Sequence, residues 1–395
     1  MDKSANQVFK SLFEAGAKAF KNLRNTAIAP ETQKILKDYS ISDVAEMVGR
    51  TSQTLRNLEE VGRIPQARLA QKGKRSERVY NLREINQLRS FFNTRPKKPT
   101  NSPPAILGFI NFKGGAGKTT SAVCCAQYFA QKGYRVLFID CDSQGSATQM
   151  FGHIPDEDFS ENDTILNLLI GQSHNIREVI RKTYWDSLDL IPANLTLYNA
   201  ELIIPTQIAE YAAKTGKQLA FYNQLNLHLK QIYEDYDIII LDCPPSMGMI
   251  SINAIYATNA LLVEMPPVIV DFSSTIQFFK MVYEVMERLP TKNYGFIRIL
   301  VTKYNGRINA MQLKELLHAY CGEDVMSNSM MQSEAISKAS SNMQTLYEID
   351  KFDGDRKTFD RALQSANLVN EEIENLVKLM WEQVQRKLEA QSTVT

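Results

Sequence analysis

The chain has 395 residues, of which 44% are hydrophobic and 23% charged, and its formal net charge is +1. This composition is typical of a soluble protein, and the length predicts two or three folding units. The five cysteines contain no C-x-x-C pair, which argues against a disulfide framework or a zinc ribbon. The N-terminus has no signal-peptide core, and no run approaches the ~20 apolar residues that cross a bilayer. We therefore expect a cytoplasmic protein.

Residues 3–25 are predicted to form an amphipathic helix, because apolar side chains recur at helical spacing and three phenylalanines widen the apolar face. One helix cannot bury such a face alone. The sequence leaves open whether it packs on its own domain or pairs with a second subunit, and a membrane-surface helix is the less favoured alternative. We assign residues 1–38 to an N-terminal helical segment that serves dimerisation.

Residues 41–65 have the pattern of a helix-turn-helix. Ser42 can cap a first helix, Gly49 supplies the turn, and Thr51 can cap a second helix. Short polar side chains at the start of a recognition helix suit the major groove of DNA. The residues that would face the groove are Ser52, Gln53, Thr54, Arg56 and Asn57.

Residues 66–82 are predicted to form a hairpin wing after this motif. Between residues 50 and 98 the chain has 13 Lys/Arg and 4 Asp/Glu, a local net charge of about +9. Localised positive charge is typical of nucleic-acid binding. A solvated basic surface on a protein–protein module is the alternative. The basic residues assigned to the wing are Lys72, Lys74, Arg75 and Arg78.

A proline-rich stretch, NTRPKKPTNSPP at 93–104, marks a domain boundary. We assign residues 39–95 to a winged helix-turn-helix domain, 96–104 to an extended linker, and 105–395 to a second domain. In that domain, short apolar runs alternate with helical stretches, which predicts a mostly parallel sheet covered by helices on both faces. The runs are 105–112, 135–140, 237–242, 260–265 and 296–301, and a last helix is expected at about 368–390.

The strongest motif is 113-KGGAGKTT-120, directly after the first apolar run. Its glycines allow backbone amides to point at phosphate oxygens, and the following helix adds its positive end. Lys118 can reach the β- and γ-phosphates, and Thr119 can ligate Mg²⁺. We expect this loop to bind ATP or ADP through Gly114, Gly115, Ala116, Gly117, Lys118, Thr119 and Thr120.

Two further strands end in carboxylates. Asp140 closes the run 136–140, with Asp142 two residues beyond, and Asp242 closes the run 237–242. The carboxyl ends of parallel strands face the ligand crevice of an open α/β sheet. Asp242 is therefore placed to hold a Mg²⁺-bound water.

Together these segments resemble the three boxes of the ParA/MinD superfamily of deviant Walker ATPases. The loop KGGAGKTT resembles the deviant Walker A box, and 140-DCDSQ-144 resembles the second box, with Ser143 where proline is common. The resemblance implies that Lys113 reaches across a nucleotide-sandwich dimer to the partner's phosphates, as a positive charge supplied in trans. It also implies that Asp142 orients or deprotonates the attacking water. Asp140 would contact the loop lysine or the Mg²⁺ shell, and Gln144 would lie in the switch.

Two weaker similarities concern the base. The segment 301-VTKYNG-306 is similar to the family segment whose asparagine reads the adenine edge, which implies a contact from Asn305. The segment 264-EMPPVIVD-271 resembles the loop that flanks the base, which implies contacts from Pro266 and Asp271.

With its N-terminal motif, the chain resembles the larger plasmid-partition ParA proteins. The resemblance implies a P-loop NTPase preceded by a winged helix-turn-helix domain, with slow hydrolysis unless stimulated. It implies an ADP form that binds operator DNA and represses its own operon, and a nucleoid-associated ATP dimer on nonspecific DNA. It also implies a ParB-type partner that triggers hydrolysis. Basic residues that could contact nonspecific DNA are Arg307, Lys338 and Lys357.

Three other functions were weighed. A MinD-like membrane-localised regulator needs a basic amphipathic C-terminal helix, but glutamates oppose the lysines of 368–390. An iron–sulfur reductase needs suitably placed paired cysteines, which are missing between Cys141 and Cys243. A nucleotide-responsive repressor without turnover is disfavoured by Asp142. We therefore expect no membrane partner.

Overall fold

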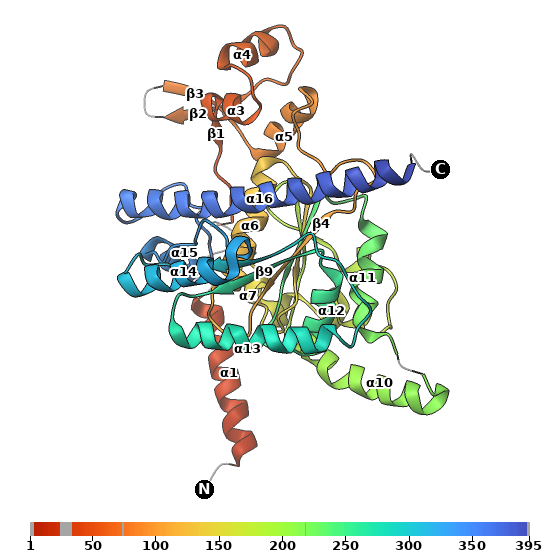
Figure 1. Cartoon of the computed structure of the whole chain (residues 1–395). Helices are drawn as coiled ribbons and strands as arrows, with labels where there is room; N and C mark the ends of the chain where they lie inside the picture. Colours follow the sequence, from red (N-terminus) through yellow and green to blue (C-terminus); the bar gives the residue numbers. More distant parts are fainter. Residues whose placement is uncertain (1–3, 24–33, 73–74, 218, 393–395) are drawn as a thin grey trace.

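The structure is a computed structural model, and it describes residues 4–23, 34–72, 75–217 and 219–392. A large α/β body lies at the centre, a smaller unit built from residues 39–92 sits on one side of it, and an isolated helix projects from the opposite side (Figure 1).

The body is built on a seven-stranded sheet in which every neighbouring pair is parallel except the edge pair β6–β7. The predicted fold class, a mostly parallel sheet with helices on both faces, is confirmed. All five apolar runs form strands, whereas β7 and β6 were not predicted, because Asp189 interrupts the apolar run of β7 and β6 has only 2 residues. In spatial order the strands are β10 (Phe296–Val301), β9 (Ala260–Met265), β4 (Ala105–Ile110), β8 (Ile238–Asp242), β5 (Val136–Asp140), β7 (Leu188–Ile191) and β6 (Arg181–Lys182).

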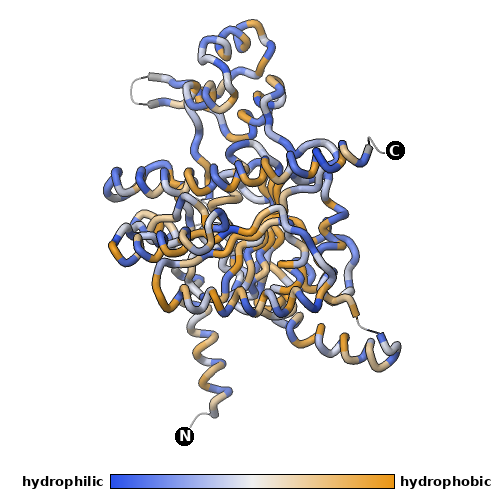
Figure 2. The backbone as a smooth tube through the Cα atoms, viewed as in Figure 1, coloured by the Kyte–Doolittle hydropathy of each residue, from blue (hydrophilic) through white to orange (hydrophobic). Residues whose placement is uncertain are grey.

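Helices cover both faces of this sheet, and the most hydrophobic chain lies in the strands between them (Figure 2). One face packs against α6 (Lys118–Lys132), α7 (Ser146–Met150), α15 (Glu334–Ser341) and α16 (Arg356–Ser392). The other face packs against α9 (Leu166–Leu169), α10 (Ala200–Thr215), α11 (Gln224–Leu229), α12 (Met249–Ala257) and α13 (Ile269–Met286). The short helix α8 (Pro155–Asp158) follows α7, and α14 (Ile308–Cys321) packs beside β9 and β10.

The C-terminal helix is longer than predicted. It spans Arg356–Ser392 rather than 368–390, because Phe359, Ala362 and Ala366 extend its buried face by three turns towards the N-terminus. The sequence analysis did not predict this extension, because small residues such as alanine contribute little to the hydrophobic periodicity of a helix.

The smaller unit has its own core and a three-stranded antiparallel sheet in the order β1-β3-β2. Its elements are β1 (Tyr39–Ser40), α3 (Ile41–Met47), α4 (Ser52–Glu60), β2 (Arg68–Lys72), β3 (Arg75–Tyr80) and α5 (Leu82–Phe91). Gly49 lies between α3 and α4 with φ +66°, and the Thr51 side chain accepts from the Thr54 amide, as predicted. The predicted cap Ser42 is wrong. Ser40 caps α3, because pairing of β1 with β3 lets the helix begin at Ile41 with Asp43 closing a capping box.

The proline-rich connection is not a free extended tether. Residue Lys98 donates from its backbone amide to Asp237 Oδ1 (3.1 Å) and from its ammonium to the Ser102 carbonyl (2.9 Å). Trp381 Nε1 of α16 donates to the Pro103 carbonyl (3.1 Å). The contacts with Asp237 and Trp381 fix the connection to the body, since they satisfy polar groups that the packing buries.

The smaller unit also contacts the body directly. Asn86 of α5 donates to Asp186 (2.7 Å), and Arg95 donates to the carbonyl of Gly133 (2.9 Å) and to Ser187 (2.6 Å). Gly133 ends α6, so the unit rests on the end of the helix that begins at the phosphate loop.

The projecting helix α1 (Ala5–Leu23) exposes its apolar face. Phe9, Leu12 and Phe13 are 71%, 63% and 75% exposed. In this structure the apolar face of α1 therefore does not pack on its own domain, which was one of the two open alternatives.

Candidate functional site

The phosphate loop connects the end of β4 to the start of α6. Gly115 and Gly117 have φ of +74° and +102°, in the left-handed region that favours glycine, and Gly117 is the N-cap of α6. The Thr302 hydroxyl, just beyond β10, donates to the Ala116 carbonyl (2.6 Å) and so fixes the loop to a neighbouring strand end. The amides that open α6 consequently face the carboxyl edge of the sheet, where an anion can bind.

The two lysines of the loop lie in different surroundings. Lys118 is only 6% exposed, and its ammonium donates to the Lys113 carbonyl (3.2 Å). The Lys113 side chain is 42% exposed, and its ammonium pairs with Asp271 Oδ1 at 2.9 Å. Lys118 therefore belongs to the buried centre of the loop, whereas Lys113 lies at its accessible rim.

Two buried carboxylates stand side by side at the ends of β5 and β8, where Asp140 and Asp242 are register partners. Asp140 accepts from the Asp142 amide (3.1 Å) and from both the amide and the hydroxyl of Thr148 (2.9 and 2.7 Å). Burial raises the pKa of Asp140 to about 7, although the Thr148 bonds favour its ionised form. The predicted contact of Asp140 with the loop lysine or the Mg²⁺ shell stays a prediction, and the hydrogen-bond partners of its carboxylate are Asp142 and Thr148.

Asp242 is 1% exposed, and neither of its carboxylate oxygens has a hydrogen-bond partner of normal geometry. Burial raises its pKa well above the usual range, and the negative charge of Asp140 adds to this effect. The Thr119 hydroxyl and the positive charge of Lys118 act in the opposite direction and lower the pKa of Asp242. A buried carboxylate without a partner costs free energy unless a cation or water satisfies it, so the residues present fit a hydrated Mg²⁺ next to Thr119.

Within the described ranges, no group of three or more His, Cys, Asp or Glu side chains could hold a metal ion by itself. A Mg²⁺ ion here would therefore depend on Thr119, water and ligand oxygens, which is the usual preference of this ion.

The turn after β5 carries the second box. Asp142 is half-buried, its Oδ1 accepts from the Gln144 amide (3.0 Å), and its carbonyl accepts from the Gly145 amide (2.9 Å). These two bonds close the turn without the proline that Ser143 replaces. Gly145 has φ +62°, and a Cβ there would lie 2.5 Å from Pro155 Cγ. The turn is thus rigidly placed at the mouth of the site.

A cavity of about 380 Å³ lies beside the loop. It brings the predicted residues Lys113, Gly114, Gly115, Pro266, Asp271 and Asn305 together from three separate segments. It also contains Lys303 and Gln332, which the sequence analysis missed. Lys303 has φ +50° and precedes Asn305 in the same segment, whereas Gln332 comes from a loop that carries no recognisable motif.

Glu264 is a further polar residue that the sequence analysis did not assign. It is fully buried in β9, neither carboxylate oxygen has a partner, and burial raises its pKa well above the usual range. Its backbone carbonyl accepts from Asn111 Nδ2, and Asn111 Oδ1 accepts from the Lys113 amide (3.2 Å). The sequence did contain an indication of this residue, because a glutamate in the otherwise apolar strand ALLVEM is costly to bury.

The predicted DNA-contacting residues Ser52, Gln53, Thr54, Arg56 and Asn57 all lie on α4 and are partly or fully accessible. Lys72 and Arg75 are the residues of β2 and β3 next to the hairpin tip, and Lys74 lies outside the described residues. Arg78 pairs with the buried Glu59 (2.9 Å), although its side chain is still 38% exposed.

The basic charge of this region is partly used within the fold. Of the 13 basic residues between 50 and 98, several form ion pairs or hydrogen bonds with the body or within the unit. These are Arg68, Arg78, Arg83, Arg89, Arg95 and Lys98. The local net charge of +9 therefore overstates the positive charge that a nucleic acid would meet.

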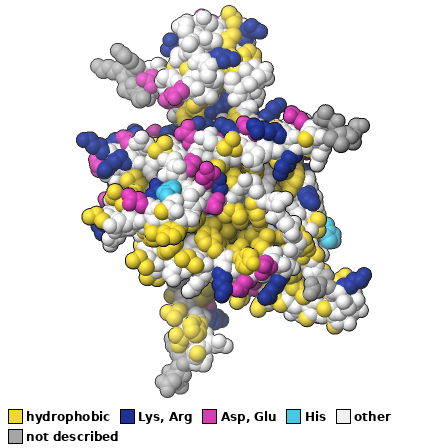
Figure 3. All heavy atoms as spheres, viewed as in Figure 1, with side chains coloured by type: hydrophobic (Ala, Val, Ile, Leu, Met, Phe, Trp, Pro, Cys, Tyr) yellow, Lys and Arg dark blue, Asp and Glu magenta, His cyan; other side chains and the backbone are white. Residues whose placement is uncertain are grey.

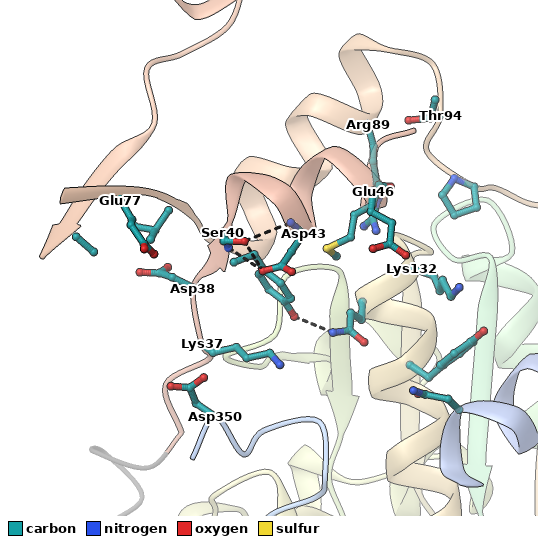
Figure 4. A pocket seen from close by; sticks show the side chains of 18 of the residues that line it. Lys37, Asp38, Ser40, Asp43, Glu46, Glu77, Arg89, Thr94, Lys132 and Asp350 are labelled. Carbon is teal, nitrogen blue, oxygen red and sulfur yellow. Dashed lines mark hydrogen bonds between the residues drawn. The ribbon is translucent and has the colours of Figure 1, made fainter. Parts of the chain in front are cut away.

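A larger cavity, of about 1050 Å³, lies between the smaller unit and helices α6 and α16. Figure 4 shows its wall, where Asp43, Glu46 and Glu77 come from the smaller unit, Asp38 from the segment just before it, and Lys132 from α6. Across it, Gln131 donates to the Tyr39 hydroxyl (2.9 Å). This cavity lies between two parts of the chain that also touch directly, and none of its lining residues belongs to the phosphate loop.

Comparison with known proteins agrees with this geometry. A family model described as an AAA domain matches residues 105–293. Protein SopA of Escherichia coli (strain K12) is 30% identical over 364 residues, which cover 90% of this chain and 92% of SopA. The chromosome-partitioning ATPase Soj of Treponema pallidum (strain Nichols) is 28% identical over 60% of this chain and 86% of Soj. A solved structure described as a partition protein has a TM-score of 0.64 at 18% identity and covers 92% of this chain and 99% of its own. The chain belongs to the ParA family of partition ATPases.

Proposed function

We propose that this chain is an ATP-driven DNA-segregation switch, in which ATP binding closes a dimer on DNA and hydrolysis opens it. The observation that carries the proposal is the convergence of the phosphate loop, the Asp142 turn and Asp242 at the carboxyl ends of three adjacent strands. These strands are separated by up to about 130 residues of sequence, and the fold brings their ends together beside one cavity.

In this proposal the loop residues from Gly114 to Thr120 bind the phosphates of ATP or ADP through backbone amides, with Lys118 at the β- and γ-phosphates. Thr119 would ligate Mg²⁺, Asp242 would hold one of its waters, and Asp140 would support the same shell. Bound Mg²⁺ would neutralise charge on the phosphate oxygens. The unpartnered oxygens of Asp242 support this assignment. Asn305, Pro266 and Asp271 are proposed to flank the adenine, since they line the cavity that continues from the loop.

Asp142 is the proposed group that orients or deprotonates the attacking water. It lies in the turn beyond β5 and is more accessible than Asp140, so a water can reach it. Two backbone amides hold the turn through Asp142, and this preorganisation is what an in-line attack on the terminal phosphate requires.

Lys113 is proposed to act on the nucleotide of a second subunit. Its accessible position at the rim of the cavity supports this role. Apolar side chains next to it also support a dimer face, because Val268, Ile269 and Val270 are 53%, 78% and 64% exposed. In Figure 3, hydrophobic side chains gather over this side of the body, around α13 and α14. The exposed apolar face of α1 is proposed as a second dimer contact.

The unit formed by residues 39–95 is proposed to be a winged helix-turn-helix that binds operator DNA. The two helices around Gly49 and the following hairpin support this role. We place the recognition surface on α4, with Arg56 and Gln53 at its centre and the hairpin tip as the wing. In the ADP form this domain would repress the chain's own operon, while the ATP dimer would bind nonspecific DNA on the nucleoid and a ParB-type partner would stimulate hydrolysis.

A MinD-like membrane regulator would need a free apolar face on its C-terminal helix, whereas Val369, Ile373 and Val377 of α16 are buried in the core of the body. No helix in the described part of the chain is long and apolar enough to cross a bilayer. The iron–sulfur alternative is also unsupported, because Cys141 and Cys243 are buried inside the core of the body.

The test is a comparison of the wild type with Lys113→Ala in three assays. We expect the wild type to dimerise with Mg-ATP in light scattering, to bind unrelated duplex DNA only with ATP, and to bind its own upstream DNA better with ADP. Lys113→Ala should still bind ATP, since Lys118 is intact, but it should remain monomeric and should not bind unrelated DNA. An ATP-independent dimer that binds both DNAs equally would refute the proposal.

A further inference from the structure

Lys34 is a buried lysine in the segment before β1, far from the phosphate loop in sequence. Its side chain is only 8% exposed. Its ammonium donates to three acceptors, the carbonyl of Met150 (2.6 Å), the carbonyl of Met343 (2.5 Å) and Glu348 Oε1 (2.8 Å). A lysine ammonium has three N–H donors, so all of them are used.

The acceptors of Lys34 are themselves fixed. The Glu348 side chain is 2% exposed and also accepts from the Tyr184 hydroxyl and from the Thr345 amide (2.7 Å). The Lys34 ammonium lies 5.4 Å from the centre of the Tyr184 ring. Burying an ion pair gives little net stability, because desolvation offsets the attraction. Such a pair instead holds the two chain segments that carry it in one relative position. Lys34 holds its own segment against three separate parts of the body.

One of these parts leads directly to the nucleotide site. Met150 is the last residue of α7, and α7 begins next to Gly145, at the end of the turn that contains Asp142. Within α7, Thr148 donates from both its amide and its hydroxyl to Asp140. A single helix of 5 residues therefore lies between the Lys34 ammonium and the carboxylates of the site.

The other side of Lys34 leads to the smaller unit. Leu36 packs against the main core, and Tyr39 begins β1 and belongs to the core of the smaller unit. Since a displacement of α7 would move the Met150 carbonyl, it would strain or break the Lys34 contacts at the root of this unit.

We propose that Lys34, with Met150, Met343 and Glu348, forms an anchor that couples the position of the smaller unit to α7 and thereby to nucleotide binding. Lys34 is a positioning residue in this proposal and does not touch the nucleotide. The proposal rests on the proposed nucleotide site. Coupling of this kind is reciprocal. If nucleotide binding changes the stability of the anchor by a given factor, weakening the anchor should change nucleotide affinity by the same factor.

Hydrogen exchange of the full chain tests the anchor, with peptides that cover residues 34–40, 113–120 and 146–150. In the wild type, adding Mg-ATP should protect 113–120 and change the exchange of 146–150 and 34–40 together. In Lys34→Met, residues 34–40 should exchange roughly tenfold to a hundredfold faster, the range expected when charge-assisted bonds are lost. They should no longer respond to nucleotide, whereas 113–120 and 146–150 still respond.

Lys37→Met is the matched control. Lys37 lies on the same segment, with its ammonium 5.7 Å from the centre of the Tyr39 ring, and this variant should exchange like the wild type. If Lys34→Met does not fold, Glu348→Gln serves instead, because it keeps the two carbonyl acceptors of Lys34. That variant should give a smaller acceleration, of about threefold to tenfold.

The outcomes separate the two proposals. If 113–120 gains protection but 34–40 of the wild type does not respond, the anchor is refuted and the nucleotide site stands. If 34–40 responds to nucleotide equally in the wild type and in Lys34→Met, the anchor is also refuted. If 113–120 gains no protection from Mg-ATP, the proposed nucleotide site fails, and the anchor proposal fails with it.

Discussion

Asp242 offers a sharp test, because the structure predicts that its replacement by asparagine raises stability while removing function. The carboxylate is 1% exposed, has no hydrogen-bond partner of normal geometry and faces Asp140 on the neighbouring strand. Burial and the Asp140 charge both raise its pKa, which means that ionisation of Asp242 at neutral pH costs folding free energy. Asp242→Asn removes the charge and keeps the shape of the side chain.

The size of the effect follows from these surroundings. Asparagine is still a buried polar side chain, so the gain comes only from removing the charge, and the desolvation penalty at stake is about 1–3 kcal/mol. For a domain of a few hundred residues this corresponds to a rise in Tm of roughly 2 to 10 °C. In a thermal melt without nucleotide, we therefore expect Asp242→Asn to melt above the wild type. Adding Mg-ATP should stabilise the wild type strongly and the variant little, because the variant cannot hold the Mg²⁺-bound water as a carboxylate does.

Asp189 supplies the matched control. It is also a buried aspartate of the same sheet, but its Oδ2 accepts from the Tyr236 hydroxyl (2.7 Å) and from the Lys182 ammonium (2.8 Å). Asp189→Asn should therefore lower Tm and leave the Mg-ATP response intact. The reasoning would be refuted if Asp242→Asn melted below the wild type or if both variants responded equally to Mg-ATP.

The remaining predictions concern other parts of the chain. Lys118→Ala should lose ATP affinity by at least about a hundredfold in calorimetry, since its charge-assisted phosphate contact has no substitute, and near-normal affinity would contradict the loop assignment. Asp142→Ala should bind ATP and stay dimeric but hydrolyse it at least about a hundredfold more slowly, so a normal rate would place the base elsewhere. Arg56→Ala should weaken operator binding by about 1–3 kcal/mol and spare ATP-dependent nonspecific binding in gel shifts, whereas equal loss of both would contradict separate DNA surfaces. Burial lowers the pKa of Lys292 to about 8. The buried charge of Lys292 destabilises the fold fully below pH 8, and this destabilisation is relieved as the pH rises from 8 to about 10.5. In denaturant melts, the free energy of unfolding of the wild type relative to Lys292→Met should therefore rise across that interval. A flat or falling difference would be inconsistent with this burial.

Local patterns in the sequence were enough to predict the phosphate loop, the strand-end aspartates and the alternation of strands and helices. Each depends on a short segment whose backbone geometry or apolar periodicity is readable without knowledge of its neighbours. The glycines of KGGAGKTT and the run DIIILD are examples, since they specify a turn and a buried strand by themselves. The same is true of the Thr51 cap, whereas Ser42 failed as a cap because pairing of β1 with a strand 40 residues later decided where α3 begins.

Contacts between distant segments could only come from the tertiary structure. The basic run at 50–98 looked like a single positive surface, but the fold directs Arg78 to Glu59 and Arg95 to the end of α6. Glu264 stands out in its apolar strand, but which charged groups surround its buried carboxylate was decided by the tertiary structure. Lys34 carries no motif at all. Its meaning depends on three acceptors that lie 116, 309 and 314 residues away. Local backbone preference is encoded residue by residue, whereas the partner of a buried charge is set by which chain segments the core brings together.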